Sequence, residues 1–366
     1  MSKNVLHLRS SFDPGGTETL LLNLFNYEQD DFNIHFVLLK NGSLAGQLVP
    51  QHGNHLYHWY RKSFLDLSVV KRLRRLVKDQ NISIIHTHQL IELCYAVVLK
   101  MWNPRLKIVH QIHLLFSSKN IFFRLERMLS QSFASIVTVS HAAKTELVDK
   151  FGFSEEKIQV LHNAVSLPGR NGKSVPSPDQ LKKPLQAGKI NVVMVANFVW
   201  GKDHETLFRA YDSFIRELLP DVNFYFIGGE SEISERLKQK YVTPADLDKG
   251  RIVFVGRISN ASALLPHFDL VVMSCFSETF NIALVEAAAA GKVVLASDIP
   301  VFQELSENGK YFHHFTTGDP RDLFESLKNV IDHLPDLRKR VNPEHFRNKY
   351  GFDNFVRSLN AIYDKL

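Results

Sequence analysis

Two glutamates in the second half of the chain, Glu278 and Glu286, stand with seven residues between them. Glu286 lies in NIALVEAAAAG (281–291), whose strong helix formers predict a helix that ends just before Gly291. The residues around Glu286 are apolar, so we expect the helix and its carboxylate to be buried. A buried carboxylate needs hydrogen-bond donors, and a vicinal diol, such as the two hydroxyls of a ribose, supplies them.

The start of this predicted helix adds a place for a phosphate. The backbone N–H groups of Phe280, Asn281 and Ile282 fall where a helix leaves donors without partners and where its dipole favours an anion. Glu278, just ahead, could reach a group attached beyond that phosphate. Together these features predict a nucleotide-sugar site. The alternative for a glutamate in a helix is a solvated face, which the alanines around Glu286 disfavour.

The segments that position these residues predict the fold. DLVVMS (269–274) and VVLAS (293–297) are typical of buried strands, and strand and helix patterns alternate along most of the chain. Residues 166–188 interrupt the alternation with four prolines and three glycines, as a linker does. We therefore expect an α/β protein with two Rossmann-like, doubly wound parallel-sheet domains, residues 1–165 and 189–349, facing a cleft.

Composition excludes several classes of protein. The 366 residues are 45% hydrophobic and 22% charged, as in ordinary globular proteins of two domains. A net charge of +6 suits anionic ligands or an anionic membrane surface but is too diffuse to indicate nucleic acid. Cys94 and Cys275 are too few for a disulfide framework, and no apolar run approaches ~20 residues. We expect a cytoplasmic protein.

Two loops carry further candidates for binding an anionic donor. Gly15 and Gly16 follow the first predicted strand, where glycines let backbone approach a ligand closely, although a plain tight turn is equally compatible. The G-x-G-x-x-G pattern of nicotinamide enzymes is missing there. Lys202 stands between a strand end and a helix start, where a cation would neutralise a pyrophosphate, and Asn197 could add an amide donor. The alternative for Lys202 is an ordinary surface lysine.

Possible metal ligands carry less weight. His86, His88, His110 and His113 gather at the ends of two predicted strands, but no cysteine or carboxylate accompanies them at ligand spacing. We expect one or two of these histidines to face the cleft, and we expect no metal. Asp246-Leu247-Asp248 resembles a D-x-D pattern but lies in a polar connection, where a solvated loop is expected.

Two basic, apolar segments are candidates for contact with anionic lipid. Residues 60–79 combine a valine and leucine face with basic residues around it, namely Lys71, Arg72, Arg74, Arg75 and Lys78. An ordinary sheet-covering helix is the slightly favoured alternative. Residues 121–127 (IFFRLER) form the second candidate.

ETFNIALVEAAAAG followed by VVLASDIP, with GKDHETL and GGTE earlier, resembles glycosyltransferase family four. The resemblance covers nearly the whole chain and implies retaining enzymes of the GT-B fold that use nucleotide sugars. It also implies that the terminal helix, 350–366, crosses back to the first domain.

The resemblance implies a role for each matching residue. Glu278 corresponds to the carboxylate on donor-sugar hydroxyls, Glu286 to the one on the ribose, and His113 to a histidine close to the reacting sugar. The other matches are Lys202, the cation on the diphosphate; Phe280, Asn281 and Ile282, its amide donors; Gly15 and Gly16, the loop over the donor; Val255, Arg257 and Ile258, beside the base; and Glu18 and His88, on the acceptor side. Many members carry arginine where this chain has Asn197, so neutralisation here is expected to depend more on Lys202.

The expected reaction moves a sugar from a nucleotide diphosphate, UDP by expectation, to an acceptor hydroxyl without cofactor or metal. Family precedent and the basic segments favour a lipid-linked glycan acceptor in surface polysaccharide assembly, with peripheral contact at the inner face of the plasma membrane. Two alternatives remain: an epimerase of the same fold acting on a free nucleotide sugar, and a non-catalytic sugar-nucleotide-binding protein.

Overall fold

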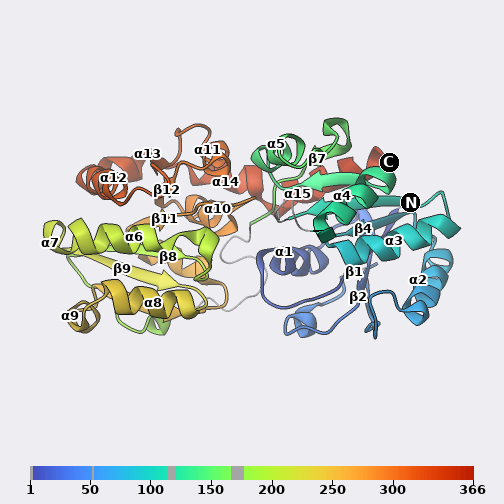
Figure 1. Ribbon diagram of the computed structural model, residues 1–366, viewed down its shortest axis with the longest axis horizontal. Coiled ribbons are helices and arrows are strands. Elements are labelled where there is room, and N and C mark those ends of the chain that lie inside the picture. Colours follow the sequence, from blue (N-terminus) through green and yellow to red (C-terminus); the bar gives the residue numbers. More distant parts are fainter. Residues whose placement is uncertain (1–2, 52, 114–120, 166–176) are drawn as a thin grey trace. The chain divides into compact units, whose positions relative to one another are not determined.

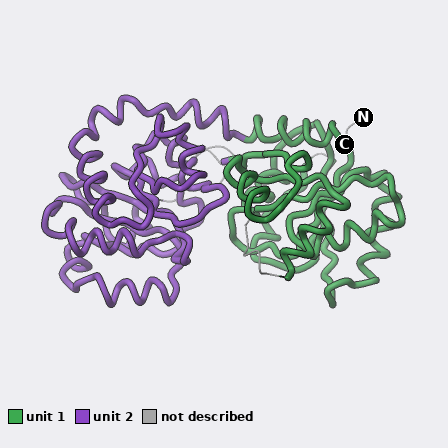
Figure 2. Tube along the Cα trace, turned by 45° about the horizontal axis from the view of Figure 1, so that its top comes forward, with its two compact units in different colours: residues 1–164, 352–366 green, residues 165–351 purple. Residues whose placement is uncertain are grey.

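The computed structural model describes residues 3–51, 53–113, 121–165 and 177–366. The chain divides into two compact units, residues 1–164 with 352–366 and residues 165–351 (Figure 2). The expected linker, 166–188, falls partly on residues 166–176, which lie outside the described residues.

Unit 1 is built on a parallel sheet with helices around it (Figure 1). Within its described residues the sheet has seven strands in the order β3-β2-β1-β4-β5-β6-β7. The strands are β1 (Lys3–Arg9), β2 (Phe32–Leu38), β3 (His55–His58), β4 (Ile84–Thr87), β5 (Lys107–Ile112), β6 (Ser135–Thr138) and β7 (Ile158–Val160). The helices are α1 (Gly16–Phe25), α2 (Leu67–Asp79), α3 (Leu90–Trp102), α4 (Ile121–Phe133), α5 (His141–Asp149) and α15 (Phe352–Asp364).

Alternation along the strands sends side chains to opposite faces of this sheet. Val5 and Ile84 pack with α1 and α15 on one face, while Leu6 and Ile85 pack with α2 and α3 on the other. The direction of the connections reverses between β1 and β4, which leaves a topological switch point at their carboxyl ends. Ligands of doubly wound sheets bind at such points.

Unit 2 repeats this design with six described parallel strands in the order β10-β9-β8-β11-β12-β13. They are β8 (Ile190–Val195), β9 (Val222–Ile227), β10 (Ile252–Gly256), β11 (Leu270–Met273), β12 (Val293–Ser297) and β13 (His313–Phe315). The helices are α6 (His204–Ala210), α7 (Arg216–Leu218), α8 (Glu232–Tyr241), α9 (Pro244–Asp248), α10 (Ile282–Ala289), α11 (Pro300–Leu305), α12 (Pro320–Asp332), α13 (Leu334–Arg340) and α14 (Pro343–Tyr350). A five-residue π-helical segment, Tyr211–Ile215, joins α6 to α7.

The prediction of two doubly wound parallel sheets is confirmed. The helix predicted at 281–291 is α10, and Gly291 follows it with a φ of 73°, which suits a residue without a Cβ. The sequence pattern did not predict the short edge strands β3 and β13 or the helices α13 and α14. The terminal helix α15 belongs to unit 1, where Tyr27 bonds Asp353 and Lys3 bonds Asn360.

The prediction of a solvated loop at residues 246–248 is wrong. Asp246 is buried in α9, where its carboxylate accepts from the backbone N–H and the hydroxyl of Thr243. The hydroxyl of Tyr211 also donates to it, at 2.5 Å. A short helix with its own N-cap has little periodicity to reveal it, and Asp246 is part of that cap rather than a metal ligand.

Candidate functional site

At the carboxyl edge of the unit 2 sheet, Lys202 forms an ion pair with Glu278. Lys202 ends a 3-10 turn (Trp200–Lys202) after β8, and Glu278 lies in the loop between β11 and α10. The two loops are joined through backbone, because the carbonyl of Gly201 accepts from the N–H of Phe276 at 2.9 Å. Their side chains are 23% and 12% exposed, and burial lowers the pKa of Lys202. A ligand can therefore reach a partly desolvated pair of opposite charges.

The loop that carries Glu278 is hydrogen-bonded to Ser297, the last residue of β12. Ser297 donates to the carbonyl of Cys275 at 2.7 Å and accepts from its N–H at 3.1 Å, while Ser274 donates to the carbonyl of Asp203 at 2.8 Å. These bonds join the start of the loop to the end of the next strand and to the residue after Lys202. The position of the ion pair is thus set by buried backbone contacts.

The N-terminus of α10 directly follows Glu278. Asn281 is its N-cap, and its side-chain oxygen accepts from the N–H of Leu284 at 3.0 Å. The N–H groups of Ile282 and Ala283 are the first-turn donors that a helix cannot satisfy itself. Phe280, by contrast, precedes the helix, with its ring buried against Tyr350. An anion beside Glu278 and Lys202 would meet the positive end of this helix.

The prediction that Glu286 is buried is wrong, because its side chain is only partly buried. Glu286 lies one helical turn after Ile282, on a partly exposed stripe that includes Ala283 and Ala290. The opposite side of α10 is buried, and it holds Leu284, Val285, Ala287, Ala288 and Ala289. Alanine fits either environment, so an alanine-rich helix does not show which side faces the core. Glu286 consequently shares a face with the first turn of α10.

A second group gathers where β8, β9 and β10 end. The exposed Asn197 accepts from the N–H of Gly229 at 2.7 Å. A Cβ on Gly229 would lie 3.0 Å from Nη2 of Arg257 and 3.1 Å from Oδ1 of Asn197, so the guanidinium lies close to this amide. Val255 is buried within β10, while Ile258 is half-buried beyond it. Asn197 therefore uses its oxygen to fix a loop, and Arg257 brings a cation beside it.

In unit 1, the glycine loop adjoins a buried ion network that the sequence analysis missed. Gly16 is the first residue of α1, Gly15 is its N-cap, and Glu18 pairs with the buried Arg9. Arg9 also contacts the fully buried Glu92 at 3.3 Å. Burial opposes protonation of Arg9, but the charges of Glu92 and Glu18 outweigh it and raise its pKa. Glu18, expected on the acceptor side, is thus tied to the sheet.

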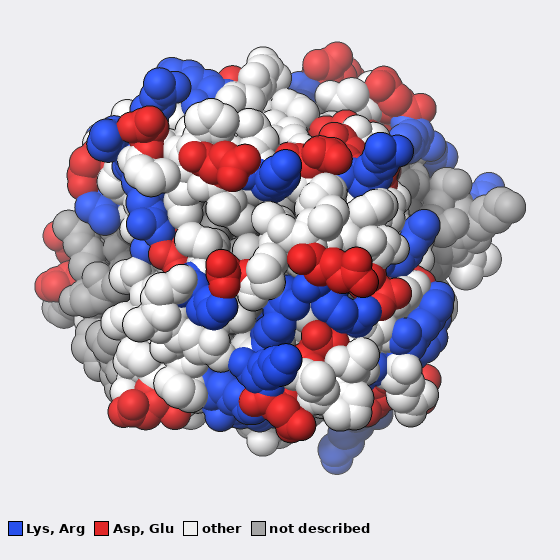
Figure 3. All heavy atoms as spheres, turned by 90° about the vertical axis from the view of Figure 1, so that its left-hand side faces the viewer, with Lys and Arg blue, Asp and Glu red and all other residues white. Residues whose placement is uncertain are grey.

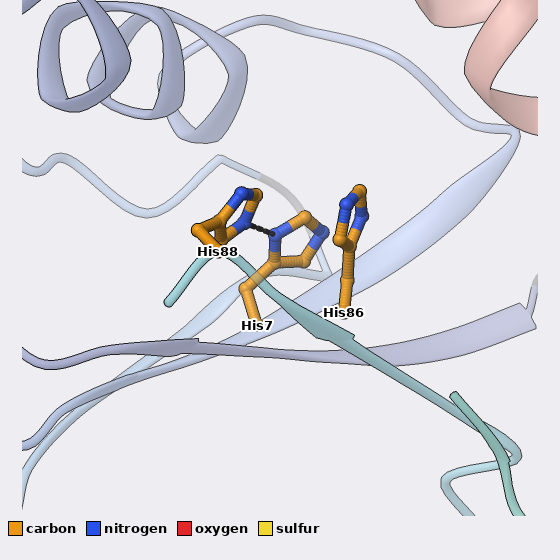
Figure 4. A group of neighbouring side chains, drawn as sticks. All are labelled: His7, His86 and His88. Carbon is orange, nitrogen blue, oxygen red and sulfur yellow. Dashed lines mark hydrogen bonds between the residues drawn. The ribbon is translucent and has the colours of Figure 1, made fainter. Parts of the chain in front are cut away.

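The histidines at the carboxyl edge of unit 1 form two groups. His110 points to the face covered by α4, where it contacts Glu126 at 3.0 Å and Thr87 at 2.9 Å. His86 and His88 lie on the α15 side with His7, which sequence reasoning missed (Figure 4). His7 and His86 are register partners in β1 and β4, so strand parity points both rings to the same face.

The second group is linked by hydrogen bonds. His88 bonds His113 through Nδ1 at 3.1 Å and His7 through Nε2 at 3.4 Å. The hydroxyl of Tyr363 bonds His7 at 3.2 Å and His86 at 2.7 Å. Burial lowers the pKa of His7 and of His113 to about 3, and it lowers the pKa of His86 and His88 well below 6.5. All four rings are therefore neutral at pH 7.

Three of these rings, His7, His86 and His88, each offer a nitrogen within 4.8 Å of the others, a spacing that a metal ion needs. The rings of His86 and His88 are stacked, with centroids 4.6 Å apart and planes 21° apart. Lone pairs lie in the ring plane, so stacked rings direct them side by side instead of toward one point. The ring nitrogens instead form the hydrogen bonds to Tyr363 and between His7 and His88.

Among the described residues of unit 1, helix α4 carries an exposed apolar stripe. On α4, Ile121, Phe122 and Met128 are 73%, 63% and 56% exposed, next to the exposed Arg124, whereas Glu126 and Ser130 are buried. None of the helices in the described ranges has the length and apolar content needed to cross a bilayer. On the face shown in Figure 3, which is the left-hand side of Figure 1, basic and acidic side chains are interspersed.

Comparison with known proteins places these features in a family. Residues 14–168 match the model "Glycosyltransferase Family 4", and residues 189–333 match "Glycosyl transferases group 1". The O-antigen chain mannosyltransferase RfbU of Salmonella typhimurium is 26% identical over 66% of this chain and 63% of its own length. An N,N'-diacetylbacillosaminyl-diphospho-undecaprenol N-acetylgalactosaminyltransferase of Campylobacter jejuni is 26% identical over 44% of this chain and 38% of its own. Anabaena HepE, solved with UDP and glucose, has a TM-score of 0.78 at 19% identity and covers both chains completely.

Proposed function

Because the chain belongs to the glycosyltransferases of family 4 and group 1, we propose that it transfers a sugar from a UDP-sugar to the hydroxyl of a lipid-linked glycan, with retention of anomeric configuration. Its setting would be the assembly of a bacterial surface polysaccharide, because the similar Salmonella enzyme acts on O-antigen and the similar Campylobacter enzyme on an undecaprenol-linked sugar. We place the protein in the cytoplasm, against the inner face of the plasma membrane.

The observation that carries this proposal is the ion pair of Lys202 and Glu278 beside the N-terminus of α10. A diphosphate can take the place of Glu278 on Lys202 while it accepts from the first-turn N–H groups of the helix. Glu278 is then released to accept hydrogen bonds from sugar hydroxyls. Glu286, one turn further along the same face, is placed for the ribose diol. Glu278, the first turn of α10 and Glu286 would thus bind the sugar, the diphosphate and the ribose, in this order along the chain.

Arg257 supports the same assignment. Its guanidinium lies near Asn197, where many members of the family place an arginine. We therefore assign Arg257 as a second cation near the nucleotide, in addition to Lys202. The two cations and the helix terminus offset the negative charge of the diphosphate, and on that basis we propose that transfer requires no metal ion.

Catalysis in this proposal is electrostatic. The bond between the anomeric carbon and the diphosphate oxygen breaks, and the acceptor oxygen bonds to that carbon from the same face. The acceptor proton passes to the departing phosphate, so no enzyme nucleophile is needed. Lys202 and the helix N-terminus stabilise the charge that develops on the leaving group. In unit 1 we assign Gly15 and Gly16 to the donor, and His113 to the reacting sugar.

The acceptor side rests on unit 1. Glu18 and His88 remain our candidates there, and their bonds to Arg9 and to His113 fix their positions in unit 1. Since α4 follows β5 in a parallel sheet, its N-terminus lies at the same edge as His88 and His113. Ile121 and Phe122 would enter the bilayer at that edge, and Arg124 would meet anionic headgroups. A lipid-linked acceptor would then arrive beside the histidines.

The test is a thermal-shift screen of nucleotides and nucleotide sugars, followed by transfer assays on synthetic polyprenyl-diphosphate sugars. We expect UDP and one UDP-sugar to stabilise the protein, and we expect transfer to continue in EDTA with the anomeric coupling of the donor retained. Inverted product would exclude the proposed stereochemistry. Product formed without acceptor would indicate an epimerase, and binding without any turnover a non-catalytic subunit.

A further inference from the structure

The hydrogen bonds of Tyr363, His7, His88 and His113 form one continuous chain within unit 1. The distances along it are 3.2 Å from Tyr363 to His7, 3.4 Å from His7 to His88 and 3.1 Å from His88 to His113. His7 and His88 use both ring nitrogens in the chain, one on each side. Figure 4 shows the central bond between these two rings. A fifth group, His86, joins at the far end through Tyr363.

A neutral imidazole has one N–H donor and one bare nitrogen acceptor. If His7 donates to His88, then its other nitrogen must accept from Tyr363, and His88 must donate to His113. If His7 accepts from His88, every bond reverses. The protons in the chain therefore all point one way, and fixing one end fixes the tautomer at the other. The bond between Tyr363 and His86, at 2.7 Å, is shorter than the bond between Tyr363 and His7, at 3.2 Å, as expected if the hydroxyl donates to His86 and accepts from His7.

We propose that Tyr363, His7 and His88 are positioning residues that hold His113 in a single tautomer, so that the ring carries its proton on a defined nitrogen beside the reacting sugar. The inference rests on the proposed function for the identity of that sugar, but the tautomer itself does not depend on it. Tyr363 lies on α15, which joins unit 1 only after the chain has completed unit 2. Formation of the site in unit 1 thus requires its last helix.

The direct test is the ring nitrogen spectrum of His113 in protein with labelled histidine, since the two nitrogens of an imidazole differ in shift according to which one is protonated. In the wild type we expect one protonated and one bare nitrogen. In Tyr363→Phe, which removes the hydroxyl between His86 and His7, we expect averaged signals from two tautomers. Averaged signals in the wild type, or an unchanged spectrum in the variant, would overturn the proposal.

Two further variants separate this role from general stability. Tyr57→Phe removes another hydroxyl that bonds a histidine, His35, at 3.4 Å on β2, and it should leave His113 unchanged. His7→Phe keeps an aromatic ring but breaks the chain between Tyr363 and His88, and it should reproduce the effect of Tyr363→Phe. If Tyr363→Phe and Tyr57→Phe changed the His113 spectrum equally, the proposal would be contradicted, because the change would then follow from losing any tyrosine hydroxyl in unit 1.

Activity provides the second readout. We expect kcat for transfer to fall by about 2- to 10-fold in Tyr363→Phe, the loss of one neutral hydrogen bond, with the KM for the nucleotide sugar unchanged. If the tautomer changes but kcat does not, the positioning role fails while UDP binding can still support the proposed function. Stoichiometric zinc in the purified wild type, lost in His7→Phe, would show a metal site in place of the hydrogen-bonded chain.

Discussion

The ammonium group of Lys202 and the carboxylate of Glu278 neutralise each other at the edge of the unit 2 sheet. Both groups are assigned here to different parts of one ligand, the diphosphate and the sugar. Their pairing keeps each charge satisfied in a partly desolvated place until a ligand with both parts arrives. A nucleotide without sugar would separate the pair and leave Glu278 without its cation. The intact nucleotide sugar, which offers hydroxyls to Glu278, should therefore bind more tightly than the nucleotide alone.

Replacing Lys202 with alanine should reduce the rate of transfer by about 10²-fold or more, because charge on the leaving diphosphate loses a preorganised cation. The measurement is kcat at saturating donor. Lys189→Ala is the matched control, since Lys189 pairs with Asp221 at the opposite, amino-terminal edge of the same sheet. Near-normal turnover in Lys202→Ala would remove this residue from the mechanism.

Replacing Glu286 with alanine should weaken binding of UDP by roughly 1–3 kcal/mol, the usual range for hydrogen bonds to a charged group. Its partial exposure favours the lower end of that range. Isothermal titration of UDP provides the measurement, and Glu325→Ala, on the exposed side of α12, provides the control. Equal affinity for UDP in both variants would show that Glu286 does not hold the ribose.

The fold was predictable because its buried strands and helices alternate with strong patterns, as β11, α10 and β12 illustrate. Lys202 and Glu278 follow strands that neighbour each other in the sheet, so their proximity follows from topology. Their ion pair depends on side-chain positions that a pattern does not contain. The exposure of Glu286 was mispredicted because alanine does not distinguish a core face from an open one.

The hydrogen-bonded chain of histidines could not be predicted from local sequence patterns. His7 and His86 share a face because β1 and β4 are neighbours, which requires the strand order. Tyr363, which bonds both, follows His7 by 356 residues and His86 by 277. A period-two count along each strand could have placed His7 and His86 inward on their strands. Only the packing of α15 could bring the tyrosine hydroxyl between them.

The free energy of unfolding of unit 1 should fall as the pH is lowered below 6.5. Burial holds the pKa of His7 and His113 at about 3 in the folded state. Because the usual pKa is 6.5, the unfolded chain binds more protons between these values, and folding loses stability as the pH falls. Each such histidine should cost about 1.4 kcal/mol between pH 7.5 and 5.5.

Urea unfolding at these two pH values measures that loss. A Trp200→Phe background leaves Trp59 and Trp102 as fluorescent reporters, both in unit 1. His7→Phe should make the pH dependence shallower by about 1.4 kcal/mol, whereas replacing the exposed His58 serves as the control. An identical pH dependence in His7→Phe and the wild type would mean that His7 is protonated in the folded protein.

The exposed stripe on α4 should determine binding to anionic membranes. Changing Phe122 and Leu125 to serine removes apolar area that would leave water in the bilayer interface, and each fully buried side chain of this kind contributes about 1.5–3 kcal/mol. We expect the wild type to float with vesicles that contain anionic lipid, to do so less at high salt, and the double variant to remain in solution. Leu218→Ser is the control, because Leu218 is an exposed leucine of unit 2. If the double variant and the control float equally, α4 is not the membrane contact, and the lipid-linked acceptor must reach the histidine edge by another surface.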